Sequence, residues 1–160
     1  MLPVSAIGFT CTESSYYSPE TKCNNVFDQD DSTEWITRDK ADGAWIKISF
    51  NAEIIITKML YRHNYGESFT NQYFEDALFT FSDGRKLNVT LPYPQIDRSE
   101  RGIYFKIDPP VLSTFLEIEM LSGYDLSKNG AKDSPTDWKN RYGISYIQIY
   151  GIQNGRKSTQ

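Results

Sequence analysis

The segment from Asn24 to Trp35, NNVFDQDDSTEW, gathers acidic and hydroxyl side chains directly before a tryptophan. Oxygens at this density could bind a metal ion or supply a catalytic pair of carboxylates. They could equally shape a polar turn, in which Asp and Ser side chains cap backbone N–H groups and Trp35 enters a core. The segment by itself leaves these three alternatives open, so the elements around it must decide between them.

Catalysis by a nucleophile or by zinc has little support in the sequence. The only histidine is His63, and its neighbours lack any known nucleophile signature. Cys11 and Cys23 are not accompanied by a second Cys or His pair at zinc-ligand spacing. Glu75 and Asp76 are adjacent, and consecutive strand residues point to opposite faces, so we expect that they cannot flank one glycosidic bond. The sequence therefore predicts that the protein is not an enzyme.

Length and charge limit the classes of partner. A chain of 160 residues suits one domain over residues 1–160, with a core of about residues 5–152. The formal net charge is -4, and the lysines and arginines are scattered, so we expect no nucleic-acid partner. The longest apolar run, within Glu53–Leu60, is too short to cross a bilayer, and the first ten residues have no signal-peptide features.

Period-two patterns predict strands. In AWIKISF, Ile46 and Ile48 alternate with Lys47 and Ser49, which is typical of a strand with one buried face. The other expected strands are IIITKMLYR, FEDALFTF, KLNVTL, FLEIEML and ISYIQIYG. Asp83-Gly84 joins two of them as a hairpin turn. Several short strands without a helical stripe predict an all-β antiparallel sandwich.

Three long connections join these strands, and loops of such length in a compact domain are usually functional or disordered. They are HNYGESFTNQY, PYPQIDRSERG and SGYDLSKNGAKDSPTDWKNRYG. The third contains Trp138, Arg141 and Tyr142, which a disordered segment would not need. We therefore expect the function to lie in these connections.

Three segments together resemble a known family. ESSYYSPETKCNNVFDQDDSTEWIT, followed by GAWIKISF and closed by ISYIQIYG, resembles the discoidin domains, or coagulation-factor C-type domains, of the galactose-binding-like superfamily. Asp28, Asp30, Thr33 and Trp35 fall on the family's loop pattern, Trp45 on its next strand, and Tyr150-Gly151 on its ending. The resemblance covers nearly the whole chain. It implies a jelly-roll β-sandwich with a binding role, and it implies that Trp35 and Trp45 both lie in the core, as the alternation around Trp45 also suggests.

The resemblance also implies a structural Ca²⁺ ion held by Asp28, Asp30 and Thr33. Calcium takes six to eight oxygen ligands, and FDQDDST supplies carboxylate, carbonyl and hydroxyl oxygens. Two positions depart from the family pattern, because Gln29 replaces a glycine and Tyr146 stands where a glutamate often completes the shell. The alternative, a turn capped by Asp and Ser side chains, remains open.

Two cysteines and one asparagine bear on the cellular location of the protein. Cys11 and Cys23 flank one turn, so we expect a disulfide between them, and two buried free thiols are the alternative. Asn88 begins the tripeptide Asn-Val-Thr, a glycosylation acceptor. Both features favour an extracellular or cell-surface location, although intracellular relatives of the fold keep the other compartment open.

The expected function is recognition without catalysis, with a glycan or glycoprotein as partner. Sugar binding needs an aromatic face for stacking and polar groups for the hydroxyls. The connections offer seven candidates: Arg62, His63, Asn64, Tyr65, Trp138, Arg141 and Tyr142. Ordinary loop packing is the alternative for each residue. The alternative function is a protein-interaction or structural module of a larger assembly, while membrane phospholipid ranks lower because the loops lack apolar pairs in basic surroundings.

Overall fold

The computed structural model describes residues 2–3, 7–28, 30, 32–38, 42–63, 72–91, 103–125 and 142–154. The elements follow in the order β1 (Leu2–Pro3), β2 (Phe9–Glu13), η2 (Pro19–Thr21), η3 (Cys23–Phe27), β3 (Trp35–Ile36), β4 (Trp45–His63), β5 (Gln72–Phe74), β6 (Asp76–Phe81), β7 (Lys86–Thr90), β8 (Ile103–Met120), β9 (Gly123–Asp125) and β10 (Gly143–Gln153). Every pairing between these strands is antiparallel.

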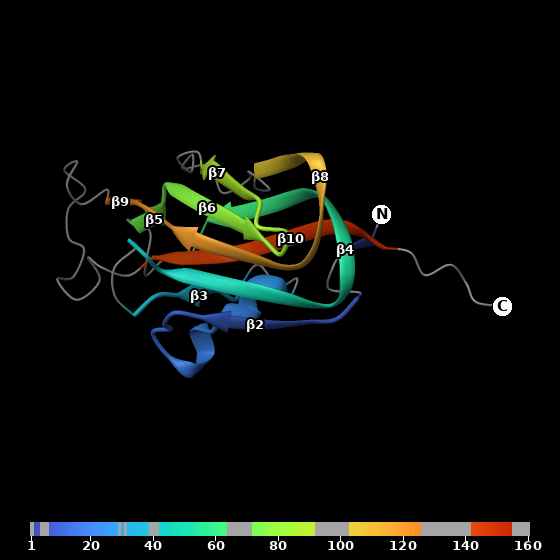
Figure 1. Cartoon of the computed structure of the whole chain (residues 1–160). Helices are drawn as coiled ribbons and strands as arrows, with labels where there is room; N and C mark the ends of the chain where they lie inside the picture. Colours follow the sequence, from blue (N-terminus) through green and yellow to red (C-terminus); the bar gives the residue numbers. More distant parts are fainter. Residues whose placement is uncertain are drawn as a thin grey trace.

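The strands form two layers because β4 and β8 each run through both of them. In the first, which we call the β6 layer, residues 45–50 of β4 pair with β2 on one side and with the end of β8 on the other. Strand β8 pairs onward with β6, and β6 pairs with β7. In the second, the β10 layer, residues 54–61 of β4 pair with β10 and with the start of β8. The two strands bend at the same end of the sandwich, on the right of Figure 1, where their register shifts between Ser49 and Ile54. This jelly-roll sandwich confirms the predicted fold class.

Alternating side chains fill the space between the layers, as the period-two patterns predicted. Ile46, Ile48 and Phe50 of β4 are buried, and so are Ile147 and Ile149 of β10 in the opposite layer. The predicted hairpin is also present, since β6 pairs with β7 across Asp83-Gly84. Gly84 has a φ of 88°, a left-handed conformation that glycine adopts without a Cβ penalty.

The two tryptophans have different environments. Trp35 is fully buried, and its Nε1 donates to the carbonyl oxygen of Ser15 at 2.9 Å. Trp45 is only half-buried, so its expected place in the core was wrong. Successive strand residues point to opposite faces, and the alternation that buries Ile46 and Ile48 turns Trp45 outward together with Lys47.

Candidate functional site

The ends of two long connections meet at one end of the sandwich. His63, the last residue of β4, pairs with Ile144 at the start of β10. Gln72, the first residue of β5, pairs with Asp125 at the end of β9. The strands that bound residues 64–71 and residues 126–142 are therefore neighbours, on the left of Figure 1. Of the seven candidate ligand residues, Arg62 and Tyr142 are described with their side chains and His63 with its backbone, whereas Asn64, Tyr65, Trp138 and Arg141 lie outside the described residues.

Tyr142 lies in the core behind this end. Its side chain is 8% exposed, and its ring centroid is 5.5 Å from that of Phe74, which stacks on Trp35 at 5.7 Å. Its backbone exchanges two hydrogen bonds with Thr37, whose Oγ1 accepts from Tyr142 N and whose N donates to Tyr142 O. A contact between Tyr142 and a ligand stays a prediction, but the ring position suits a support for the connection rather than a stacking surface.

Arg62 lies over an aromatic ring of the β10 layer. Its guanidinium carbon is 5.6 Å from the centroid of Tyr146. The two residues are direct cross-strand partners in β4 and β10. Arg62 is thus placed both near the end of β4 and beside the outer face of the β10 layer.

The acidic segment folds into consecutive side-chain-capped turns. Asp28 Oδ1 accepts from Asp30 N at 2.8 Å, and Asp30 Oδ1 accepts from both the N and the hydroxyl of Ser32. The hydroxyl and then the backbone N–H of Ser32 lower the pKa of Asp30. These contacts are those expected of the turn alternative.

The hydroxyl of Thr33 lies among more acceptors than it can satisfy. Its Oγ1 is 2.7 Å from Asp28 Oδ2, 2.9 Å from Asp30 O and 3.1 Å from Asn25 O. A hydroxyl carries one proton, so two of these three oxygens remain without it. Such a gathering of carboxylate, carbonyl and hydroxyl oxygens fits the ligand chemistry of calcium, and a bound ion would be held by Asp28, Asp30 and Thr33.

No further carboxylate completes this set within the described residues. Among them no three His, Cys, Asp or Glu side chains group as metal ligands would. Tyr146 of β10 directs its hydroxyl to Gln148 Oε1 at 2.9 Å. The donor set is therefore rich in neutral oxygens and carries two carboxylates, and calcium stays a prediction.

Glu34, between this segment and Trp35, has an unusual environment for a carboxyl group. Burial raises its pKa from the ordinary value of 4.5 to about 7. Its backbone carbonyl accepts from Asn25 Nδ2 at 3.0 Å, but its carboxyl makes no hydrogen bond or ion pair within the described part of the chain. Sequence reasoning grouped Glu34 with the other acids and missed this difference, because burial is a tertiary property.

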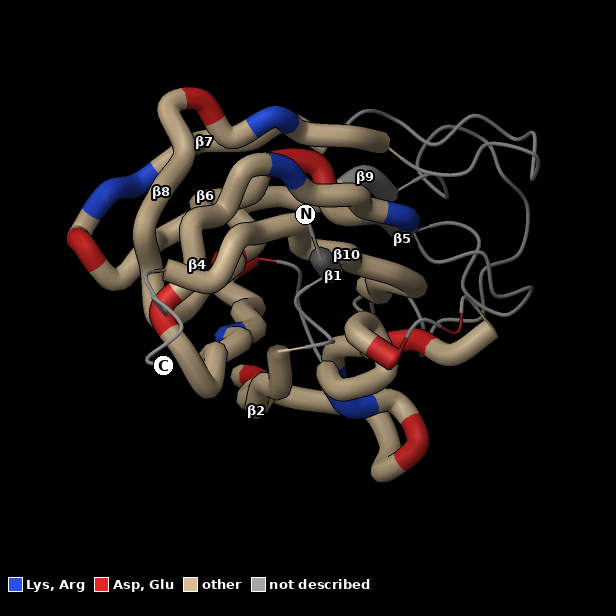
Figure 2. Tube along the Cα trace, turned by 90° about the vertical axis from the view of Figure 1, so that its right-hand side faces the viewer, with Lys and Arg blue, Asp and Glu red and all other residues tan. Residues whose placement is uncertain are grey.

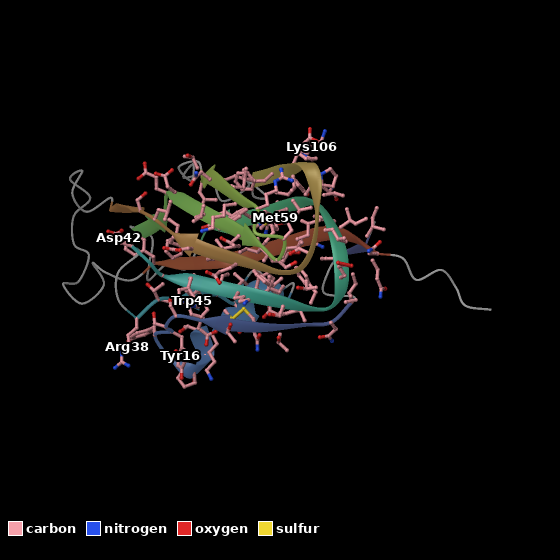
Figure 3. All side chains as sticks on the ribbon, viewed as in Figure 1. Tyr16, Arg38, Asp42, Trp45, Met59 and Lys106 are labelled. Atoms are coloured by element: carbon pink, nitrogen blue, oxygen red, sulfur yellow. A yellow bond between two sulfur atoms is a disulfide. The ribbon has the colours of Figure 1, made fainter. Side chains whose placement is uncertain are left out.

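The predicted disulfide is confirmed. Cys11 of β2 is bonded to Cys23 of η3, with their Cα atoms 6.1 Å apart. Figure 3 shows the bond in yellow beside β2. It links β2 to the helical turn that precedes the acidic segment.

The adjacent carboxylates Glu75 and Asp76 lie on the same side of the chain, contrary to the sequence expectation. The hydroxyl of Ser122 is 3.4 Å from Glu75 Oε2 and 3.2 Å from Asp76 Oδ2. The opposite-face rule fails because Glu75 lies in the break between β5 and β6 and not within a strand. Asp76 also accepts from Thr90 Oγ1 at 2.9 Å. Asp76, Thr90 and Asn88 line a groove of about 400 Å³.

Asn88 is exposed on β7, next to this groove. An exposed acceptor is accessible to glycosylation, which stays a prediction. Among the described residues no helix is long and apolar enough to span a membrane. Acidic and basic positions are interspersed along the described trace as a whole (Figure 2).

The sandwich is similar to solved carbohydrate-binding modules. A family 32 module of Clostridium perfringens NanJ in complex with galactose matches with 12% identity over 92% of this chain and 95% of that chain, with a TM-score of 0.65. Chitosan-binding module 1 of a Paenibacillus chitosanase/glucanase matches with 13% identity over 94% of this chain and 100% of that chain, with a TM-score of 0.61. A family 89 glycoside hydrolase of Clostridium perfringens matches with 16% identity over 97% of this chain but 15% of its own, with a TM-score of 0.64.

No protein-family model matches the sequence, and no curated protein matches it. Likeness at these identities shows the fold. The chain has the β-sandwich fold of these carbohydrate-binding modules.

Proposed function

We propose that the chain is a non-catalytic carbohydrate-binding module of the discoidin type that acts outside the cell. One observation carries the proposal: the sandwich is similar to sugar-binding modules over nearly the full length of both partners, so it corresponds to the module itself. The disulfide between Cys11 and Cys23 supports the location, since disulfides persist mainly in oxidising compartments.

The binding site of this proposal is the end of the sandwich where the connections after β4 and β9 begin. Arg62, His63, Asn64 and Tyr65 belong to the first connection, and Trp138 and Arg141 belong to the second. The pairing of His63 with Ile144 supports the proposal because it keeps the flanking strands of the two connections together. Trp138 would stack on a sugar ring, and Arg62 and Arg141 would donate to its hydroxyls.

Calcium would have a structural role in this module. We propose that Asp28, Asp30 and Thr33 hold the ion, which would screen the oxygens that gather around the Thr33 hydroxyl. The ion would fix the segment that leads into buried Trp35.

A glycan array with calcium and with EDTA tests the proposal. We expect binding to defined sugars, and we expect Trp138→Ala to weaken it by about 1–3 kcal/mol with little change in melting temperature. Silence on the array, together with capture of a protein partner, would instead favour an interaction module. Hydrolysis of a bound glycan that Asp76→Asn abolishes would contradict the non-catalytic assignment.

A further inference from the structure

The outer face of the β10 layer carries an unusual set of side chains. Strand β10 contributes Tyr146, Gln148 and Tyr150, the second part of β4 contributes Lys58, Leu60 and Arg62, and the start of β8 contributes Tyr104 and Lys106. We call these eight residues the tyrosine–lysine face. Outward positions of an exposed sheet commonly hold short polar side chains, whereas here three of the eight are aromatic and three are cationic.

The aromatic rings of this face are held in position by one another. The hydroxyls of Tyr146 and Tyr150 both donate to Gln148 Oε1 at 2.9 Å. Leu60 lies between Tyr104 and Gln148 in the cross-strand register and is only 6% exposed, although it is on the outer side of the layer. Tyr104 is 61% exposed. The face is therefore a preordered aromatic surface with one largely accessible ring.

Cations lie over these rings. The Nζ atom of Lys58 is 4.5 Å from the ring centroid of Tyr150 and 5.5 Å from that of Tyr104. Arg62 lies over Tyr146. The side chain of Lys106 is 82% exposed, and Figure 3 shows it pointing away from the sandwich while Met59 lies inside. Each of the two cations of β4 thus lies over a ring of a neighbouring strand.

The charge of this face is opposite to that of the chain. The strand segments 54–63, 103–107 and 143–153 contain no Asp or Glu, in a chain whose net charge is -4. Lys58 and Lys106 are direct cross-strand partners. Like charges at such positions destabilise a sheet, and within the described part of the chain the carboxylate of Asp108 lies 4.0 Å from Lys106 Nζ. The two lysines therefore concentrate positive charge at adjacent positions of the outer face.

We propose that the tyrosine–lysine face binds a uronate-containing polysaccharide. The exposed ring of Tyr104 would stack on the apolar face of a sugar, and Lys58, Lys106 and Arg62 would pair with the carboxylates of the polymer. Tyr146 and Tyr150 are four residues apart on β10, about 13 Å between their backbone positions, so the face is longer than one sugar ring and suits a polymer. The inference rests on the proposed function only in that the ligand is a glycan, since the surface is a different one and shares only Arg62 with the loop-end site.

Titration calorimetry with polygalacturonate on the whole chain tests this inference. We expect binding that weakens as salt rises, because its charges are screened. Tyr104→Ala and Lys106→Gln should each weaken it about tenfold, with melting temperatures close to that of the parent because both side chains are largely exposed. Lys58→Gln should have a similar effect because it removes the charge and leaves a polar side chain on the outer face.

The chain provides a matched control in Tyr16 and Lys22. Lys22 Nζ lies 4.8 Å from the ring centroid of Tyr16, which is 39% exposed. The same contact between a lysine and a tyrosine ring thus occurs outside the tyrosine–lysine face. Tyr16→Ala and Lys22→Gln should leave polygalacturonate binding unchanged. Equal weakening by control and test variants would overturn the inference, as would the absence of binding at low salt.

Two further measurements, on lipid vesicles and on neutral sugars, distinguish this inference from its alternatives and from the proposed function. Binding of the chain to phosphatidylserine vesicles but not to polygalacturonate, lost in Tyr104→Ala, would overturn the glycan assignment in favour of a lipid surface. Neutral sugars bound on the array without polygalacturonate would overturn this inference and leave the proposed function standing. A third outcome would confirm this inference and contradict the proposed loop-end site. In it, Tyr104→Ala weakens polygalacturonate binding, Trp138→Ala leaves it unchanged, and no neutral sugar binds.

Discussion

At the scale of single residues, the packed rings of Phe74 and Tyr142 leave no room for a side chain at Gly123. A Cβ atom added to Gly123 would lie 2.2 Å from Cε1 of Tyr142, closer than any real contact. The ring of Tyr142 would have to leave its place against Phe74. We expect Gly123→Ala to lower the free energy of unfolding by about 1–3 kcal/mol, as overpacking does.

Chemical denaturation of Gly123→Ala, Tyr142→Leu and the double variant checks this expectation. If the clash is the cause, the double variant should be more stable than the sum of the two single effects allows. Strict additivity would show that the cost of the alanine arises elsewhere.

The raised pKa of Glu34 predicts that the stability of the protein depends on pH. Its pKa is about 7 in the folded chain and 4.5 in the unfolded one, so the folded chain binds more protons between these values. The stability that the neutral carboxyl contributes is complete below pH 4.5 and is lost as the pH rises through 7. We expect Glu34→Gln, which cannot ionise, to gain about 1–2 kcal/mol relative to the parent between pH 4.5 and pH 8, after allowance for partial exposure.

Urea unfolding of both proteins across this range, in EDTA so that no calcium ion contributes, provides the measurement. Parallel stability curves for parent and variant would mean that Glu34 keeps its ordinary pKa.

At the scale of elements, the disulfide fixes the helical turn η3 to strand β2. It closes a loop with a sequence separation of 12 residues, for which the chain-entropy model gives about 3 kcal/mol. We expect reduction of the parent to lower its stability by roughly this amount. Cys11→Ser should reproduce the loss and should remove the response to reductant, because no disulfide can then form. Cys11 is the cysteine to replace because it is less buried than Cys23. A parent whose melting temperature is unchanged by reductant would contradict the prediction.

At the scale of the whole molecule, the two layers share strands β4 and β8. Neither layer can separate without breaking the continuous strands that also build the other. We therefore expect one cooperative unfolding transition, with equal calorimetric and van't Hoff enthalpies. Two resolved transitions would show that the layers are independent, and that residues 1–160 do not behave as the single domain predicted.

Local physical rules determined much of the fold from the sequence. The alternation in strands β4, β8 and β10 predicted which side chains face the core, because the side-chain period of a strand does not depend on its partners. Asp83-Gly84 predicted the hairpin because a positive φ favours glycine. Cys11 and Cys23 flank a single turn, and their pairing was predicted for that reason.

The tertiary structure decided what local rules could not. Trp45 is turned outward by the same alternation, and Glu75 and Asp76 meet at Ser122 because Glu75 lies in the break between β5 and β6. The tyrosine–lysine face gathers residues from three strands that are far apart in sequence. Sequence shows the outward tyrosines of β10, but only strand pairing shows that Lys58 and Tyr104 lie beside them, because cross-strand neighbours are set by register and not by distance along the chain.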